Sequence, residues 1–181
     1  MTWTIDSAHT EIDFSVRHMM ITNVRGQFQK FSGTIEFNET NPANSKVDVQ
    51  ISVASVNTKD EKRDAHLKSA DFFDVEKYPY ITFQGTRIDV KDKTYAVVYG
   101  DLSMHGITHE VALDVDFNGM AKSPWGSTSA GFSAKTELNR KEWGLIWNVA
   151  LETGGFLVGD DIKIAIESEI VKQAKMEPVA A

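Results

Sequence analysis

The stretch that decides the fold is DIKIAIESEIV, residues 161 to 171. Its even positions carry Ile162, Ile164, Ile166 and Ile170, with lysine and glutamate residues between them. Successive side chains of a β-strand point to opposite faces, so a two-residue period is typical of a strand with one buried and one wet face. The stretch therefore predicts a strand of that kind.

The same alternation recurs along the chain. It marks seven further segments, at about 12–17, 31–37, 47–53, 81–90, 95–104, 111–117 and 130–138. The rhythm is lost over Met19 to Arg25, and its phase changes near Gly85, which predicts a bulge or bend there. A tight connection is expected at His105 and Gly106. Many strands with little helix favour a closed or two-layered antiparallel sheet with an apolar interior.

One helix is expected. Thr58 can cap the free amide of Glu61 while the Glu61 side chain reaches back, which is the pattern of a capping box. This pattern predicts a short helix after Thr58, from Lys59 to about Ser69. The fold class predicted from these patterns is all-β with one short helix.

Length and charge limit the classes of function. The chain has 181 residues, enough for one domain with a sizeable core, and we expect that domain to span residues 1–172. Residues 173–181 are expected to form a disordered tail. The net charge of -7 opposes attraction to nucleic acid or to anionic lipid surfaces, because both need clustered Lys and Arg. Nucleic acid is therefore not expected as a partner.

Location and redox chemistry can also be addressed from the sequence. The chain has no cysteine, and so offers no disulfide, thiolate nucleophile or thiolate metal site. No window approaches the ~20 consecutive apolar residues of a membrane-spanning helix. The stretch Met1 to Asp6 lacks the basic and apolar runs of a secretion signal, so a cytoplasmic location is expected. If a signal peptide has been removed, the location would be periplasmic or secreted.

The histidines give no catalytic or metal motif. His105 and His109 lie four residues apart, a spacing of ~13 Å along a strand, which is too far to share an ion. His18 has the parity of Phe14 and Val16 and should point inward, either as a hydrogen-bonded core residue or as a ligand contact. No nucleophile elbow of the G-x-S-x-G type is present. We therefore predict no catalytic residue, no metal site and no cofactor.

The segment from Asn139 to Gly159 fits no strand pattern. It is rich in apolar residues, including Trp143 and Trp147, and is interrupted by glycines. It could form a lid or wall over the mouth of a pocket. It could equally be a long connection packed on the barrel, or the contact of a homodimer.

The order of short motifs along the chain resembles the YceI family of lipocalin-like, polyisoprenoid-binding proteins. The resemblance spans residues 3 to about 172. Each motif is short, but the ordered set is specific. It comprises Trp3, Ile5, Asp6, His9, Phe14, Val16, His18, Asn23, Val24, Arg25, Gly26, Phe28, Phe31, Gly33, Ile35, Arg63, His66, Leu67, Asp71, Phe72, Phe73, Asp74, Tyr78, Pro79, Gly100, Leu102, His105, Gly106, Thr108, Gly131, Phe132, Leu138, Arg140 and Gly144.

The resemblance implies an extended eight-stranded antiparallel barrel, with the helix after Thr58 lying across it and a tunnel for a long isoprenoid or related lipid. A barrel of eight strands can hold one slender ligand when its inner side chains leave space. Burying hydrocarbon contributes roughly 0.8 kcal/mol per CH₂, so a few isoprene units would bind tightly without a specific hydrogen bond.

Parity and the resemblance together give the candidate ligand-binding residues. The inward-facing candidates are Phe14, Val16, His18, Phe31, Ile35, Phe37, Ile81, Phe83 and Phe132. Trp143 and Trp147 are expected near an opening. A polar or phosphorylated head group would need hydrogen-bond donors, for which the candidates are Arg25, His18 and Arg63.

Three hypotheses about function follow. The first is noncatalytic binding, transport or storage of a polyisoprenoid or other long lipid. The second is an enzyme acting on a hydrophobic substrate through His18 or the neighbourhood of His105. The third is an oligomeric stress-related protein whose barrel is filled by its own side chains. A homodimer is compatible with all three.

Overall fold

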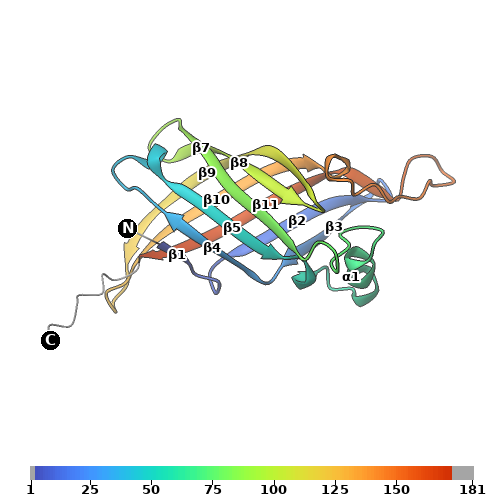
Figure 1. Ribbon diagram of the computed structural model, residues 1–181, viewed down its shortest axis with the longest axis horizontal. Helices are drawn as coiled ribbons and strands as arrows, with labels where there is room; N and C mark the ends of the chain where they lie inside the picture. The colour runs from blue at the N-terminus through green and yellow to red at the C-terminus, as the bar shows by residue number, and fades with distance from the viewer. Residues whose placement is uncertain (1–2, 173–181) are drawn as a thin grey trace.

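A computed structural model describes residues 3–172 of the chain. Its long strands are tilted to the long axis of the molecule and surround a common interior (Figure 1). The described residues form eleven strands, one α-helix and three short 3₁₀ helices. The strands are β1 (Trp3–Ile5), β2 (Glu11–His18), β3 (Thr22–Phe28), β4 (Phe31–Glu36), β5 (Lys46–Ser52), β6 (Val56–Asn57), β7 (Tyr80–Val90), β8 (Tyr95–Met104), β9 (Ile107–Lys122), β10 (Thr128–Asn139) and β11 (Val158–Lys172). The helices are η1 (Pro42–Asn44), η2 (Val53–Ser55), α1 (Glu61–Lys68) and η3 (Arg140–Trp143).

Hydrogen bonds close the sheet into a barrel of eight antiparallel strands. The ring runs β1-β4-β5-β7-β8-β9-β10-β11, and it closes because β1 pairs with β4 on one side and with β11 on the other. Strands β2, β3 and β6 continue the sheet from β11, which pairs with β2 over the part of its length that β1 does not reach. The predicted fold class, an eight-stranded antiparallel lipocalin-like barrel with one short helix, is confirmed.

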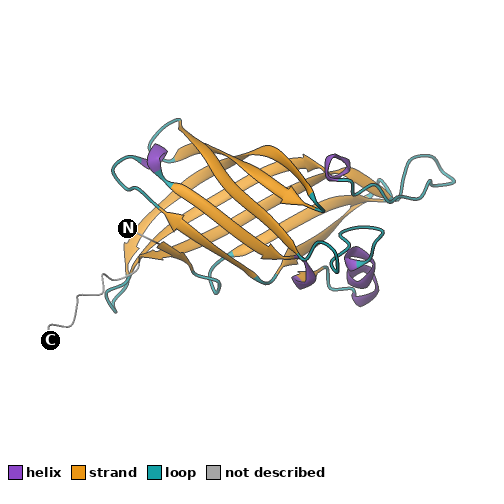
Figure 2. Ribbon diagram, in the orientation of Figure 1, coloured by secondary structure: helices purple, strands orange, loops and turns teal. Residues whose placement is uncertain are grey.

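The barrel is long and narrow because its strands are long. Strand β9 has 16 residues and β11 has 15, and an extended chain of that length spans about 50 Å. Figure 2 shows the strands as the body of the molecule, with α1 and η2 gathered at one end. Strand β1 and the end of β11 lie toward the opposite end (Figure 1). Such a shape suits a slender ligand lying along the barrel axis.

Two local predictions are confirmed. The β7–β8 pairing changes register between Gly85 and Arg87, as the change of apolar phase predicted. The connection between β8 and β9 is a two-residue turn in which His105 and Gly106 have φ values of 53° and 75°. The φ > 0 region is open to glycine at little steric cost, which explains the residue at the second position.

Three strands were not predicted: the short strands β1 and β6, and β3, which has seven residues. The region from Met19 to Arg25 lost the alternation, yet β3 begins at Thr22. The inward positions of β3 are Val24, Gly26 and Phe28, and Gly26 lies opposite Phe14. A Cβ on Gly26 would overlap the ring of Phe14. An inward glycine is therefore required there, and it hides the strand from a count of apolar residues.

The start of the helix differs from the prediction. Helix α1 begins at Glu61, and its N-cap is Asp60, whose Oδ1 accepts a hydrogen bond from the Arg63 amide at 3.0 Å. Thr58 is instead tied to Asp64, because its hydroxyl and its amide both donate to Asp64 Oδ1, at 2.6 and 2.9 Å. The prediction of a capping box at Thr58 was therefore wrong. Thr58 and Asp60 are both favourable N-cap residue types, and Asp60 is the one that caps the helix.

Two further predictions concern the C-terminal tail and membrane-spanning helices. The tail at 173–181 lies outside the described residues. Over residues 3–172, no helix has both the length and the hydropathy needed to cross a membrane.

Candidate functional site

The barrel encloses a cavity of about 790 Å³. Ligand pockets in proteins commonly measure about 300–1,000 Å³, so this cavity has room for a sizeable ligand. Its walls come from the inward positions of the ring strands and of β2 and β3, and most of them are aliphatic or aromatic. The alternative in which the barrel is filled by its own side chains is therefore wrong.

Polar lining residues gather at the two ends of the cavity. Near α1 the lining includes His18, Lys62 and Arg63, while the opposite end has Glu39, Asp92 and Lys93 beside hydroxyl groups. The middle is lined by alternating positions of β9 and β11, which are apolar. A ligand with a long hydrocarbon and one polar end would match this distribution, because each buried polar group needs a hydrogen-bond partner.

The mouth near α1 is covered by aromatic side chains from two segments. The ring of Trp147 packs edge-on against His66, with centroids 4.5 Å apart, and lies 5.3 Å from Phe72. His66 Nε2 is 2.8 Å from Asp71 Oδ2, which fixes the orientation of the imidazole. All three rings line the cavity. The segment after α1 and the segment before β11 therefore meet across this opening.

Arg140 holds the segment before β11 in place. Its side chain is 3% exposed and donates hydrogen bonds to the carbonyl oxygens of Gly159, Leu145, Trp147 and Val158. Asp160 Oδ1 lies 3.7 Å from Nη2. Burial lowers the pKa of the Arg140 guanidinium, while the charge of Asp160 opposes this shift. One buried side chain thus ties both ends of the segment together.

Arg63 is engaged in a second network, at the start of α1. Its Nε donates to Thr58 Oγ1 and its Nη2 to the Thr58 carbonyl, both at 2.8 Å. Thr58 in turn donates to Asp64. The half-buried Arg63 therefore anchors α1 to the end of β6 and is also one of the residues that line the cavity.

Eleven of the thirteen candidate ligand-binding residues line the cavity. They are Phe14, Val16, His18, Phe31, Ile35, Phe37, Arg63, Ile81, Phe83, Phe132 and Trp147. Arg25 does not, because β3 places it on the outer face, where it is exposed opposite Ser15. Trp143 does not either, although it was expected near the opening. Whether the eleven residues contact a ligand stays a prediction.

Trp143 is packed into the wall instead. It is 1% exposed, and its Nε1 donates to the Leu102 carbonyl at 3.0 Å. Two histidines hold its helix η3: His105 Nδ1 donates to the Trp143 carbonyl and His109 Nε2 to the Glu142 carbonyl, at 3.0 and 2.9 Å. These two imidazoles therefore each have a structural partner in η3.

Many residues that line the cavity were not among the predicted site residues. The alternations that predicted β9 and β11 also carried the lining side chains Val111, Val115, Ile164 and Ile166. Their inward parity in the alternating pattern is the signal that identifies them as lining residues. His66 and Phe72 could not be found in this way, because they lie outside the strands and no two-residue period applies to them.

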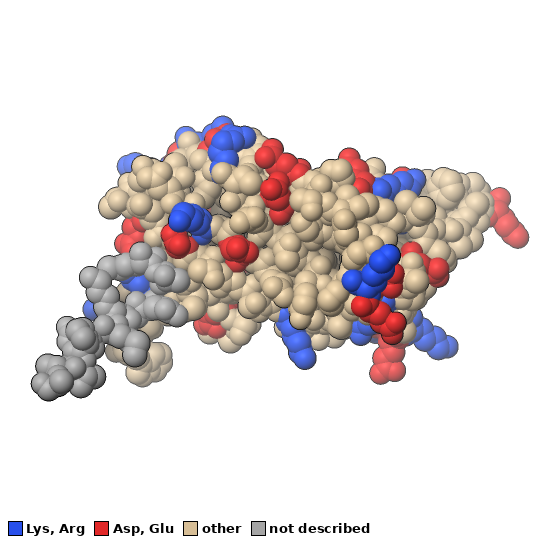
Figure 3. Space-filling model, in the orientation of Figure 1, with Lys and Arg blue, Asp and Glu red and all other residues tan. Residues whose placement is uncertain are grey.

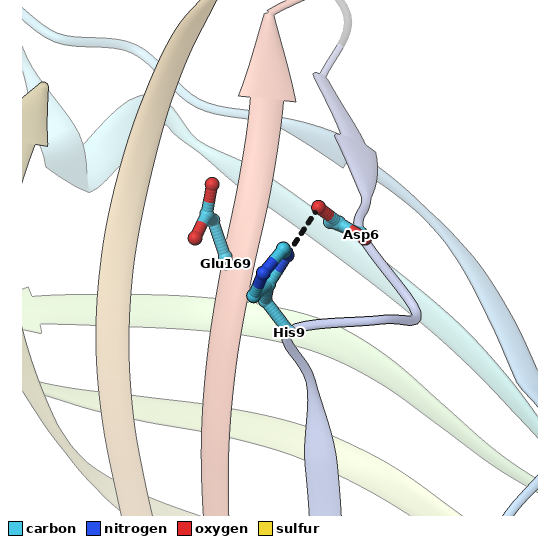
Figure 4. Close-up of side chains that lie close together, drawn as sticks. All are labelled: Asp6, His9 and Glu169. Atoms are coloured by element: carbon cyan, nitrogen blue, oxygen red, sulfur yellow. Dashed lines mark hydrogen bonds and ion pairs between the residues drawn. The ribbon is translucent and has the colours of Figure 1, made fainter. Parts of the chain in front are cut away.

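A cluster of three titratable side chains lies outside the cavity, where β1 turns into β2 (Figure 4). Asp6 Oδ2 lies 2.8 Å from His9 Nδ1, and Asp6 Oδ1 accepts a hydrogen bond from the Ala8 amide. Glu169 of β11 is the third member. Both Asp6 oxygens serve the turn, so this cluster has a structural explanation.

The Asp6–His9 pair predicts a pH effect. Its hydrogen bond raises the pKa of His9 above 6.5 and lowers the pKa of Asp6 below 3.8. The His9 contribution to stability is complete below pH 6.5 and is lost as pH rises through the folded-state pKa. The Asp6 contribution is complete above pH 3.8 and is lost as pH falls through its folded-state pKa. Asp6→Asn should therefore bring the pKa of His9 back toward 6.5, as followed by NMR titration.

The control for this titration is Asp161→Asn. Asp161 is exposed and lies at the far end of β11 from Glu169, so its removal should leave the pKa of His9 unchanged. An unaltered His9 titration in Asp6→Asn would contradict the assignment of the shift to this pair.

The closed antiparallel barrel and its apolar cavity define a lipocalin-like barrel protein. The chain belongs to the YceI family, since the family model described as YceI-like domain matches residues 3–170. It is 39% identical over 168 residues to a Staphylococcus aureus (strain N315) protein described as UPF0312 protein SA2479, covering 92% of this chain and 95% of that protein.

Two solved structures resemble the barrel. The Campylobacter jejuni YCEI protein has a TM-score of 0.75 and 32% identity, covering 87% of this chain and 90% of that chain. A polyisoprenoid binding domain from Saccharophagus degradans has a TM-score of 0.69, covering 94% and 98% of the two chains. At 12% identity, that second likeness concerns the fold alone.

Proposed function

We propose that this protein is a noncatalytic carrier or store of a long apolar lipid, such as a polyisoprenoid. The cavity of about 790 Å³, with apolar walls along its length, is the observation that carries the proposal. Transfer of hydrocarbon from water into such a cavity is favourable in proportion to the area buried. The polyisoprenoid named in the description of the Saccharophagus degradans domain supports the same ligand class.

The two ends of the cavity suggest how such a lipid would lie. His18 and Arg63 offer hydrogen-bond donors near α1, and Lys62 adds a positive charge there. A hydroxyl or phosphate head group would bind at this end, with the hydrocarbon extending toward β9 and β11. At the opposite end the carboxylates of Glu39 and Asp92 are accompanied by the positive charges of Lys172, 2.6 Å from Glu39, and of Lys93, so that end has no comparable excess of donors.

The direct test is to extract the purified protein with organic solvent and examine the extract by mass spectrometry. We expect a long-chain lipid. Uptake of added prenyl alcohols of increasing length, followed by tryptophan fluorescence, should strengthen with each isoprene unit until the cavity is full, because each buried CH₂ contributes roughly 0.8 kcal/mol. Absence of copurified lipid together with absence of uptake would reject the proposal.

The enzyme hypothesis has its own test. Turnover of a prenyl or acyl ester that is lost in His18→Ala, with binding retained, would favour it over the carrier. The homodimer and the cytoplasmic location stay predictions, to be tested by sedimentation and by cell fractionation.

A further inference from the structure

Exposed apolar side chains gather at the end of the barrel that carries α1. Residues 3–172 include eleven large apolar side chains that are exposed, and six of them lie in two loops, with exposed fractions from 43% to 71%. We call these six residues the apolar tip: Met19, Met20, Ile21, Ile146, Val149 and Phe156. One loop is the β2–β3 turn and the other precedes β11.

The two loops lie side by side and project from the barrel (right side of Figure 1). The Met19 amide donates to the Leu157 carbonyl at 2.8 Å, and His18 pairs with Val158. A Cβ on Gly155 would overlap the sulfur of Met20, so the loops touch closely. The two loops therefore meet, and their exposed apolar side chains lie at the same end of the barrel.

Hydrogen bonds hold the longer loop in a defined shape. Asn148 accepts from the Val158 amide at 3.0 Å and donates to the Val158 carbonyl at 2.8 Å. A small hairpin follows, in which the Leu151 amide donates to the Gly155 carbonyl at 2.9 Å. These hydrogen bonds hold the loop in a conformation that leaves Val149 and Phe156 exposed to solvent, although the exposure of apolar side chains to water is unfavourable.

The tip is almost uncharged. Residues 143–158 contain one charged side chain, Glu152, although charged residues make up 25% of the chain. In Figure 3 the projecting end is mainly tan, apart from red atoms at its extreme, while blue and red side chains lie over the barrel wall and around α1. Surfaces that enter the boundary of a bilayer need this combination of apolar side chains and few charges.

The tip adjoins the cavity mouth. Trp147 and Leu157 lie in the same loop as the tip and line the cavity, as do Val158 at the start of β11 and His18 beside Met19. A long lipid that crosses from a bilayer to the cavity through water would expose its hydrocarbon. A tip set in the bilayer would remove that exposure, because the mouth would open beside the lipid.

We propose that the apolar tip docks on the surface of a phospholipid bilayer, where the cavity loads or releases its lipid. This inference rests on the proposed function. A second copy of the chain fits the tip less well, because six side chains fall short of the roughly 20–30 residues that each partner contributes to a stable interface. The net charge of -7 favours zwitterionic over anionic head groups.

The test is flotation of the purified protein with phosphatidylcholine vesicles on a density gradient. The wild type should float, and Ile21→Ser combined with Phe156→Ser should lower the partition coefficient at least tenfold, because two exposed apolar side chains are lost from the buried area. Glu152→Gln should raise partitioning, because it removes the one charge of the loop.

Trp125→Ser is the matched control. Trp125 is 91% exposed but lies in the β9–β10 turn, at the other end of β10 from η3, so its loss should not change flotation. Equal flotation of the wild type and the double variant would overturn the proposal. A fall in sedimenting mass from dimer to monomer in the double variant would overturn it in favour of a second copy.

A second measurement separates this inference from the proposed function. Uptake of a prenyl alcohol added without vesicles should be the same in the wild type and the double variant, since neither Ile21 nor Phe156 lines the cavity. Normal uptake with no flotation of the wild type would reject the docking surface alone. No uptake by the wild type would reject the carrier function itself.

Discussion

Ala134→Trp is expected to lower the affinity for a long prenyl alcohol by about 10³-fold. Ala134 lines the cavity midway along β10, between Val115 of β9 and Ile166 of β11. An indole there would take the room of about one isoprene unit. Five carbons at roughly 0.8 kcal/mol each amount to about 4 kcal/mol, and about 1.4 kcal/mol corresponds to tenfold in Kd. Equilibrium titration followed by ligand fluorescence measures the change.

Lys135→Trp is the matched control for this variant. Lys135 is the next residue on the same strand, and its side chain is exposed on the outer face of the barrel. It should bind the prenyl alcohol like the wild type. The added ring of Ala134→Trp enters open space, so its unfolding transition should stay cooperative. Equal loss of affinity in both variants, or in neither, would contradict a ligand site inside the barrel.

Arg140→Met is expected to lower the free energy of unfolding by about 3–5 kcal/mol, because each buried acceptor left without a donor costs about 1–3 kcal/mol. The substitution removes the Arg140 donor from four backbone carbonyl oxygens, of which that of Val158 still accepts from Asn148 Nδ2. For a chain of this size, each kcal/mol corresponds to about 2–4 °C in Tm, so Tm should fall by roughly 10 °C. Thermal and urea unfolding both measure it.

Lys141→Met tests whether the effect belongs to burial or to charge. Lys141 Nζ lies 3.1 Å from Asp160 Oδ2, but both side chains are more than 40% exposed. An exposed ion pair contributes about 0–1 kcal/mol, so the Tm should change little. If Arg140→Met lowered the Tm by as little as Lys141→Met, the buried guanidinium would not be the group that holds the segment before β11.

Most strands were predictable because a barrel wall has one apolar and one wet face. In β5, β9 and β11 successive side chains face the interior and the solvent in turn, so apolar and polar residues alternate in the sequence with a period of two. The same parity correctly turned Phe14, Phe83 and Phe132 toward the interior. Strand β3 was not predicted because its inward position 26 must be glycine to leave room for the Phe14 ring, which interrupts the apolar alternation.

Residues outside the regular strands could not be placed from spacing. Trp143 and Trp147 lie four residues apart in one segment, yet Trp143 packs into the wall and Trp147 covers the mouth. The Arg140 hydrogen bonds and the position of helix η3 decide this, and η3 is held by His105 and His109, more than 30 positions away in the sequence. Arg25 was placed wrongly for a simpler reason: once β3 is known, its parity puts Arg25 on the outer face.

The sequence by itself determined the class of fold and the orientation of the strand residues, because alternation is a local property that each strand carries alone. Only the tertiary structure decided that the centre is hollow. Parity states which side chains point inward, but the space left between them depends on ring closure through β1 and on strand tilt, which no single segment contains. The meeting of the two loops of the apolar tip likewise depends on the pairing of β2 with β11, which brings together residues more than a hundred positions apart.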